Sequence, residues 1–277
     1  MELTDFIQQA IAEDIGKGDF TSLSCIDASK KGRAHLLVKE NGVLAGIEFA
    51  EILLKHIDTT ISIEPKLKDG TKISSGDVAF IIEGSVHSIL KAERILLNCM
   101  QRMSGIATLT KKYVDVVAGT NAKILDTRKT TPLNRHLEKW AVRIGGGFNH
   151  RFGLYDMIMI KDNHVDYAGG IRNAIDAAYL YVKQNNLDLK IEIETRSLDE
   201  VKKVLDAGKV NRIMLDNFKP ELLKQAVELI NRKYETEASG GIVLENIKAY
   251  AETGVDFISV GALTHSVKSL DLSLKAI

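Results

Sequence analysis

A cationic segment with two histidines and a run of glycines is the part of this sequence best suited to chemistry. The whole protein has 37 basic and 37 acidic residues and no net charge. Between positions 128 and 151, however, a single acid, Glu138, stands among six cations: Arg128, Lys129, Arg135, Lys139, Arg143 and Arg151. Such a local excess in a neutral chain indicates a small, multiply charged anion rather than a polyanion such as DNA. Guanidinium groups bind carboxylates through paired hydrogen bonds, so a carboxylate-rich ligand suits this segment.

A lysine follows directly after an apolar run. The run Met157–Ile160 predicts a buried strand, and Lys161 comes at its end. A lysine placed there needs a partner or a route to water. It could pair with an anion, form a Schiff base as in aldolase-like barrels, or simply extend into solvent. The surrounding cations favour pairing with an anion.

Carboxylates and glycines follow the later apolar runs. Glu194 and Asp216 come at the ends of consecutive short runs, where they could face one cavity and share magnesium or manganese, or could be acids favoured at helix N-termini. Small residues, Ser239-Gly240-Gly241 and Gly261 to Thr264, close the last two runs. They would let backbone N–H groups approach a phosphate, although tight turns explain each one alone.

The elements that must position these residues have an α/β pattern. From about residue 122, short apolar runs alternate with helices. The runs are 122–125, 157–160, 191–193, 212–215, 234–238 and 257–260. Ser197 with Glu200 predicts a capping box, Gly208 a helix end and Pro220 a helix start. Six such repeats predict right-handed parallel units that form a barrel or a large part of one, with the chemistry at the carboxyl ends of the strands.

The first hundred residues show a different pattern. A helix is expected near the start, and then short strands of a mostly antiparallel sheet over 33–38, 42–45, 61–67 and 78–83. A second helix is expected over 89–103, with Arg102 on its polar face and Gly105 as its stop.

Composition favours a soluble protein. The chain has 277 residues, 45% hydrophobic and 27% charged, and no apolar run approaches the roughly 18 residues of a membrane span. Its two cysteines are isolated, which fits a reducing compartment, and the acidic N-terminus does not resemble a signal peptide. We therefore expect a cytoplasmic protein that binds neither membranes nor nucleic acid.

Several long segments resemble the quinolinate phosphoribosyltransferase family, also called nicotinate-nucleotide pyrophosphorylase (carboxylating). They are ERILLNCMQRMSGIAT, LDTRKTTP, LEKWAVRIGGGFNHRFGLYDMIMIKDNH, IMLDNF, EASGGI and ISVGALTHSVKSLDLSL. The resemblance runs nearly from end to end. One departure is that Pro132 is followed by Leu133-Asn134-Arg135, where the family pattern leads us to expect Gly-Leu-Arg.

The resemblance implies an α/β fold with two domains. An N-terminal α/β sandwich domain would comprise residues 1–106, joined by the C-terminal segment 267–277. An incomplete TIM-like α/β barrel would comprise residues 107–266. The family also implies a homodimer or higher homo-oligomer in which Arg102 reaches the active site of the neighbouring subunit.

The resemblance also implies a reaction and a site. The family transfers phosphoribosyl from phosphoribosyl pyrophosphate (PRPP) to quinolinate with decarboxylation, a step of NAD biosynthesis. The residues implied for quinolinate are Arg102, Thr127, Arg128, His150, Arg151 and Lys161. Those implied for PRPP are Lys129, Glu194, Asp216, Ser239, Gly240, Gly241, Gly261 and His265. Glu194 and Asp216 would also lie near a magnesium ion, as direct ligands or at one remove.

Three alternatives compete with this interpretation. A related molybdenum-transport-associated protein shares the fold and part of the arginine pattern, but the complete IKDNH segment with Lys161 argues against it. A Schiff-base aldolase would use Lys161 as its nucleophile. A non-catalytic dicarboxylate-binding module would leave Glu194 and Asp216 without a purpose.

Overall fold

The computed structural model describes residues 2–277, which divide into two compact units. Unit 1 extends to Lys111 and includes Thr130–Gly146 and Leu263–Ile277, and unit 2 comprises Lys112–Lys129 and Gly147–Ala262. The division expected from the sequence differs mainly in Thr130–Gly146, which lies in unit 1 rather than in the barrel domain.

Unit 1 is built on a four-stranded antiparallel sheet in the order β12-β1-β5-β3. The strands are β1 (Lys31–Val38), β3 (Ser62–Pro65), β5 (Val78–Ser85) and β12 (Leu272–Ala276). Buried residues alternate along β1, as expected for a strand with one face against a core. Because Leu274 of β12 pairs with Leu36 of β1, the C-terminal segment belongs to this sheet. A small ribbon pairs β2 (Gly42–Val43) with β4 (Lys72–Ile73).

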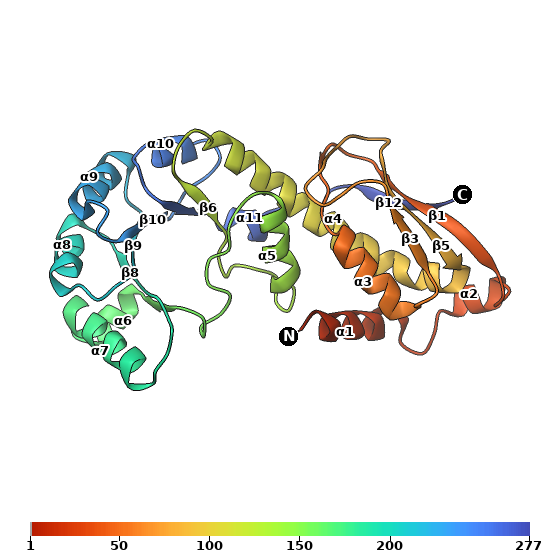
Figure 1. Ribbon diagram of the computed structural model, residues 1–277, viewed down its shortest axis with the longest axis horizontal. Helices are drawn as coiled ribbons and strands as arrows, with labels where there is room; N and C mark the ends of the chain where they lie inside the picture. Colours follow the sequence, from red (N-terminus) through yellow and green to blue (C-terminus); the bar gives the residue numbers. More distant parts are fainter. Residues whose placement is uncertain (1) are drawn as a thin grey trace. The chain divides into compact units, whose positions relative to one another are not determined.

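Helices lie alongside this sheet (Figure 1). They are α1 (Leu3–Ile15), α2 (Phe20–Cys25), α3 (Ile47–Ile57) and α4 (Val86–Val116). The expectation that the second long helix stops at Gly105 is wrong, because α4 continues for more than ten residues beyond it. A Cβ at Gly105 would lie 2.2 Å from the carbonyl oxygen of Lys268. The glycine therefore permits a close backbone approach and does not end the helix.

Helix α5 (Arg135–Ile144) explains why residues 130–146 belong to unit 1. It buries Leu137, Ala141 and Val142 along one side, as in an amphipathic helix. At its end, a Cβ on Gly145 would lie 2.5 Å from the carbonyl oxygen of Ala107 in α4. This close packing attaches the segment to α4.

Unit 2 contains a six-stranded parallel sheet in the order β6-β11-β10-β9-β8-β7. The strands are β6 (Lys123–Leu125), β7 (Ile158–Ile160), β8 (Ile191–Thr195), β9 (Arg212–Asp216), β10 (Glu235–Ser239) and β11 (Phe257–Ser259). β6 and β7 are consecutive in the chain but lie at opposite edges of the sheet and do not pair. The expected incomplete α/β barrel is therefore confirmed.

Helices line the outer side of this curved sheet (Figure 1). They are α6 (Asp162–Tyr167), α7 (Ile171–Gln184), α8 (Leu198–Ala207), α9 (Pro220–Ile230) and α10 (Ile247–Ala251), while α11 (Ala262–His265) follows β11. Pro220 is the first residue of α9, as predicted. Half of the predicted capping box forms: the Ser197 hydroxyl accepts the Glu200 N–H at 3.2 Å, but the Glu200 carboxylate accepts the N–H of Arg196 instead.

No helix within residues 2–277 has both the length and the apolar character needed to cross a membrane.

Candidate active site

Two segments that are distant in the sequence lie side by side at the carboxyl end of β6. Phe148 extends the sheet beside this strand: its N–H donates to Ile124 O at 2.8 Å, and its carbonyl accepts the N–H of Asp126 at 3.1 Å. The buried Asp126 carboxylate then accepts the backbone N–H of His150 at 2.9 Å and the side-chain amide of Asn149 at 2.5 Å. These bonds bring the segment after β6 beside residues 148–151.

Two arginines predicted to bind quinolinate converge here. Burial lowers the pKa of the Arg151 guanidinium, and the neighbouring Arg128 cation lowers this pKa further. Arg151 also donates to Met157 O at 3.3 Å. The N–H of Lys129 donates to the hydroxyl of Thr127 at 3.0 Å, which orders the turn after β6. Because two neighbouring like charges repel each other, an anion bound between them is favoured.

Lys161 and Glu194 form an ion pair across the ends of two adjacent strands. The distance from Lys161 Nζ to Glu194 Oε2 is 3.0 Å, and the lysine side chain is 46% exposed. Lys161 therefore has a carboxylate partner, and its ammonium group is accessible from solvent at the barrel mouth.

The ends of β9 and β10 are joined by hydrogen bonds. The Ser239 hydroxyl donates to Asp216 Oδ1 at 2.7 Å, and the Asn217 amide donates to Asp216 Oδ2 at 2.6 Å. Gly240 has φ +87°, and a Cβ there would lie 2.2 Å from Asn217 Oδ1, so this turn requires glycine. A Cβ at Gly241 would meet nothing within 4 Å. The backbone of this turn is thus open to a ligand, and Gly261 follows the neighbouring β11.

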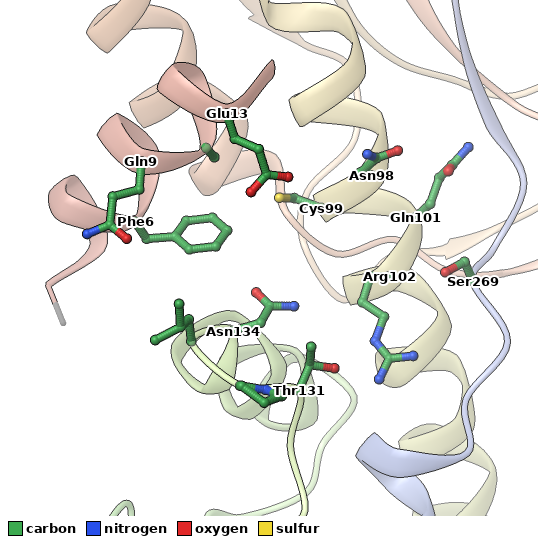
Figure 2. A pocket seen from close by; sticks show the side chains of 13 residues that line it. Phe6, Gln9, Glu13, Asn98, Cys99, Gln101, Arg102, Thr131, Asn134 and Ser269 are labelled. Atoms are coloured by element: carbon green, nitrogen blue, oxygen red, sulfur yellow. The ribbon is translucent and has the colours of Figure 1, made fainter. Parts of the chain in front are cut away.

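Arg102 and His265 belong to unit 1, where Arg102 is held by several acceptors. Its Nε and Nη2 donate to Glu138 Oε1 at 3.1 and 2.9 Å, and it also donates to the carbonyls of Val267 (3.2 Å) and Thr264. Arg102 lines a hollow of about 680 Å³ within unit 1, shown in Figure 2. His265 is exposed, with Nδ1 2.6 Å from the Ser266 hydroxyl.

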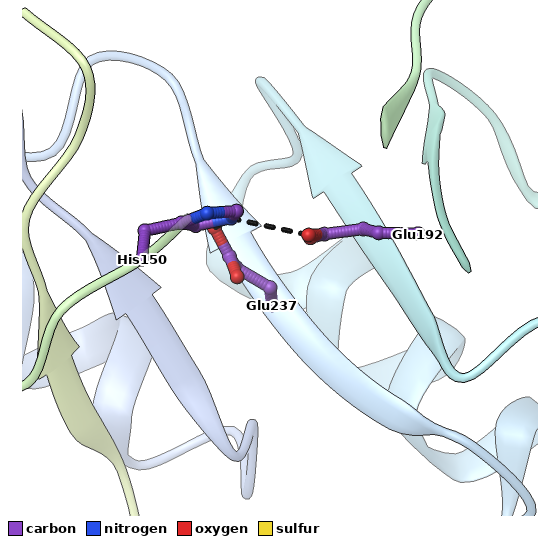
Figure 3. A group of neighbouring side chains, drawn as sticks. All are labelled: His150, Glu192 and Glu237. Carbon is purple, nitrogen blue, oxygen red and sulfur yellow. Dashed lines mark ion pairs between the residues drawn. The ribbon is translucent and has the colours of Figure 1, made fainter. Parts of the chain in front are cut away.

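A buried charged cluster lies inside the barrel and was not predicted. Nε2 of His150 is 3.1 Å from Glu192 Oε2 and 3.4 Å from Glu237 Oε1, and both carboxylates are fully buried (Figure 3). Arg212 of β9 donates to Glu237 Oε2 at 2.7 Å, and the Ser259 hydroxyl of β11 donates to Glu237 Oε1. One loop and the strands β8, β9, β10 and β11 therefore contribute to one polar core.

The cluster changes the acidity of its members. Burial by itself lowers the pKa of His150, but the contacts with Glu192 and Glu237 outweigh burial and raise this pKa to about 9. Burial and the nearby Glu237 charge raise the pKa of Glu192. Burial also acts to raise the pKa of Glu237, but His150 and Arg212 hold it below its ordinary value. The His150 ring and the Arg212 guanidinium thus face the two carboxylates within the cluster.

One signal in the sequence could have revealed this cluster. Glu192 and Glu237 are charged residues within short runs that were expected to be buried strands. A carboxylate in such a position needs a cation, and the sequence does not say which one, because His150 and Arg212 come from other parts of the chain.

The chain matches two family models that together span nearly all of it. Residues 19–104 match the quinolinate phosphoribosyl transferase N-terminal domain and residues 106–275 the C-terminal domain of the same family.

Known proteins agree with this assignment. The chain is 49% identical to the chloroplastic nicotinate-nucleotide pyrophosphorylase [carboxylating] of Arabidopsis thaliana, over 99% of this chain and 82% of that protein. It is 41% identical to the probable enzyme of that name from Bacillus subtilis, over 99% and 93% of the two chains. The crystal structure of NadC from Streptococcus pyogenes superposes with a TM-score of 0.93 at 38% identity, covering 99% of this chain and 97% of the other. The chain therefore belongs to the quinolinate phosphoribosyl transferase family.

Proposed function

We propose that this protein transfers phosphoribosyl from PRPP to quinolinate with loss of carbon dioxide, giving nicotinate mononucleotide and pyrophosphate. The observation that supports this most directly is the convergence of Arg128 and Arg151 at the barrel mouth, where the first cation depresses the pKa of the second. A dicarboxylate relieves this repulsion, and each bidentate contact with an arginine contributes about 1.5–3 kcal/mol.

In this proposal the chain divides the two substrates between two groups of residues. Thr127, Arg128, His150, Arg151 and Lys161 serve the quinolinate side. The PRPP side comprises Lys129, Glu194, Asp216, Ser239, Gly240, Gly241, Gly261 and His265. Open backbone at Gly241 and the hydroxyl of Ser239 suit phosphate oxygens, which accept hydrogen bonds from N–H and O–H groups.

The reaction follows from placing the two anions together. The quinolinate nitrogen attacks the ribose C1, and the bond from C1 to the pyrophosphate oxygen breaks with its electron pair leaving on pyrophosphate. Glu194 and Asp216 provide negative charge near the cationic ribose carbon, and Lys129 stabilises the leaving group. The ring carboxylate next to the new pyridinium nitrogen then leaves as carbon dioxide. The electron pair left on the ring carbon is stabilised by the positive nitrogen and takes up a proton.

Magnesium fits the residues at the barrel mouth. Glu194 and Asp216 are each held by hydrogen bonds or an ion pair, and the two together offer too few ligands for an all-protein cage. Protein magnesium sites commonly use one or two carboxylates and complete the shell with water and substrate phosphates. When bound, magnesium would neutralise charge on the pyrophosphate leaving group.

The proposed assembly is a homodimer or higher homo-oligomer with Arg102 donated across the interface. Donation would require Arg102 to leave Glu138, a carboxylate that is fully buried. Arg94, two turns earlier on α4, is exposed, and nothing in residues 2–277 forms a hydrogen bond or ion pair with it. Subunit mixing distinguishes the two arginines: a hybrid of an Arg102→Ala subunit with an Arg128→Ala subunit regains activity only if Arg102 acts in trans. A hybrid of an Arg94→Ala subunit with an Arg128→Ala subunit is the matched comparison.

The test of the function is formation of nicotinate mononucleotide and release of carbon dioxide from quinolinate, PRPP and magnesium, with nicotinate as the parallel acceptor. We expect turnover with quinolinate only, and loss of quinolinate binding with a retained fold in Arg128→Ala. Unchanged turnover in that variant contradicts the site. Absence of carbon dioxide release in the folded wild-type protein favours the related transport-associated protein instead.

We place the enzyme in the cytoplasm, since Cys25 and Cys99 are both free thiols.

A further inference from the structure

The segment that contains Arg151 is fixed from two sides. On the β6 side, Asp126 accepts the backbone N–H of His150. On the side of the barrel interior, the His150 ring faces Glu192 and Glu237 at 3.1 and 3.4 Å. The remaining ring nitrogen, Nδ1, accepts the backbone N–H of Arg151 at 2.6 Å. The ring therefore contacts two buried carboxylates with one nitrogen and the Arg151 backbone with the other.

We infer that Glu192 and Glu237 are positioning residues that act through His150 to present the Arg151 guanidinium to quinolinate. This inference rests on the proposed function. Neither carboxylate has any exposed surface, so neither can touch a substrate. Both carboxylates lie beside the imidazole (Figure 3), so their effect must pass through this ring, whose Nδ1 accepts the backbone N–H of Arg151.

A metal ion is the competing explanation of the cluster. Ligand atoms of His150, Glu192 and Glu237 lie within 4.8 Å of one another, a spacing compatible with a bound cation. However, both oxygens of Glu237 already accept hydrogen bonds, from Arg212 and from Ser259. The Arg212 guanidinium also stacks on Phe257 at 3.9 Å, which holds its charge beside the cluster. A divalent ion would be repelled by this fixed cation, so the ionic cluster favours positioning.

The effect should be selective for one substrate. The residues proposed for PRPP on β9 and β10 are held by separate bonds between Asp216, Asn217 and Ser239. None of those bonds involves His150. Loss of the contacts from Glu192 and Glu237 to the His150 ring should therefore displace Arg151 and leave the residues proposed for PRPP in place.

The experiment compares Glu192→Gln and Glu237→Gln with a matched control, Glu235→Gln. Glu235 also pairs with Arg212 and lies on β10, but no ion pair joins it to His150. Because a displacement of about 1 Å can cost on the order of 100-fold, we expect KM for quinolinate to rise about 10- to 100-fold in the two test variants. We expect KM for PRPP in these variants, and both constants in Glu235→Gln, to change by less than about three-fold.

Two further measurements keep the test decisive. Glu192→Asp retains the negative charge but moves it one methylene away from His150. This variant should therefore fold even if Glu192→Gln does not, and it should show the same selective rise in KM for quinolinate. The imidazole ¹⁵N signals of His150, assigned by their loss in His150→Gln, should move in Glu192→Gln and not in Glu235→Gln. An equal loss of affinity for both substrates, unchanged constants with unchanged ¹⁵N signals, or stoichiometric metal in the purified protein overturns the inference. Wild-type turnover is measured first, so a failure of the proposed function is recognised separately.

Discussion

The interior of the barrel is charged at positions where most α/β barrels have branched apolar residues. Glu192 and Glu237 are fully buried, the Arg212 guanidinium pairs with Glu237, and the His150 ring lies against both carboxylates. Removing one partner of a buried ion pair leaves an uncompensated charge and costs about 3–5 kcal/mol, whereas an intact pair adds little stability. The cluster is better understood as a device that orients side chains than as a source of stability.

This cluster predicts a dependence of stability on pH. The pKa of His150 is about 9 in the folded protein, against 6.5 for an ordinary histidine. Between these two pH values the folded state therefore binds more protons than the unfolded state. The unfolding free energy should therefore be highest below pH 6.5 and fall as the pH rises toward 9. The fall should be less than about 3 kcal/mol, because a proton on Nδ1 removes the bond that this nitrogen accepts from the Arg151 N–H. Urea unfolding at pH 6.5 and pH 9 measures the change.

The matched protein for that measurement is His150→Gln, in which Glu192, Glu237 and Arg212 remain. The variant should be less stable overall and should lose most of the pH dependence between these two values. An equal slope in both proteins would show that other groups cause the dependence.

Among the loops and helices, the segment before α5 contains a local strain. Leu133 has φ +66°, a left-handed conformation that favours glycine, and it occupies the position where the family pattern leads us to expect glycine. Its side chain is 70% exposed, so little burial compensates for the strain. Leu133 therefore departs from the family pattern at a position where the backbone conformation disfavours any residue with a Cβ.

Leu133→Gly should stabilise the protein. Relief of left-handed strain contributes about 1–2 kcal/mol, and the greater freedom of glycine in the unfolded chain offsets about 0.4–1 kcal/mol of this gain. We expect a rise in Tm of about 1–4 °C, measured by calorimetry. Leu154→Gly, an equally exposed leucine without positive φ, is the control and should lower Tm or leave it unchanged. A lower Tm for Leu133→Gly would contradict the strain.

Helix α4 gives a second prediction at this scale. Gly105→Ala improves helix propensity by about 1 kcal/mol but places a Cβ 2.2 Å from Lys268 O. Because this contact is with backbone, the neighbouring segment must shift, and we expect a net loss of about 1–3 kcal/mol in the unfolding free energy. Lys112→Ala, at an exposed position on the same helix, changes helix propensity only slightly and should leave the unfolding free energy nearly unchanged. Stabilisation of Gly105→Ala would show that the segment near Lys268 moves freely.

For the molecule as a whole, the distribution of charge matters more than its sum. The net charge is zero, yet Arg128, Lys129, Arg151 and Lys161 lie near the strand ends proposed to bind two anions. Screening shortens electrostatic attraction to about 8–10 Å at 0.1–0.15 M salt. KM for quinolinate should therefore rise about 3- to 10-fold between low and physiological ionic strength. Sucrose at equal osmolality should leave KM unchanged, and an equal effect of sucrose would exclude an electrostatic cause.

Local pattern was enough to predict the strand–helix repetition, a barrel or a large part of one, and the polar strand ends. These features depend on residues close together in the chain: apolar runs, Pro220 at a helix start, and glycines such as Gly240 where no side chain fits. The family could also be recognised, because its motifs are contiguous. The candidate residues for the two anions followed from those motifs.

Pairings between distant residues could only come from the tertiary structure. The sequence does not indicate that Gly105 faces Lys268, that Arg102 is held by Glu138, or that His150 contacts the interior carboxylates. Each depends on which elements pack together, and burial then changes the free energy of a charge by several kcal/mol. Residue type and spacing therefore indicated which groups do the chemistry. Packing decided which partner each charged side chain has and which charged side chains are fixed in position.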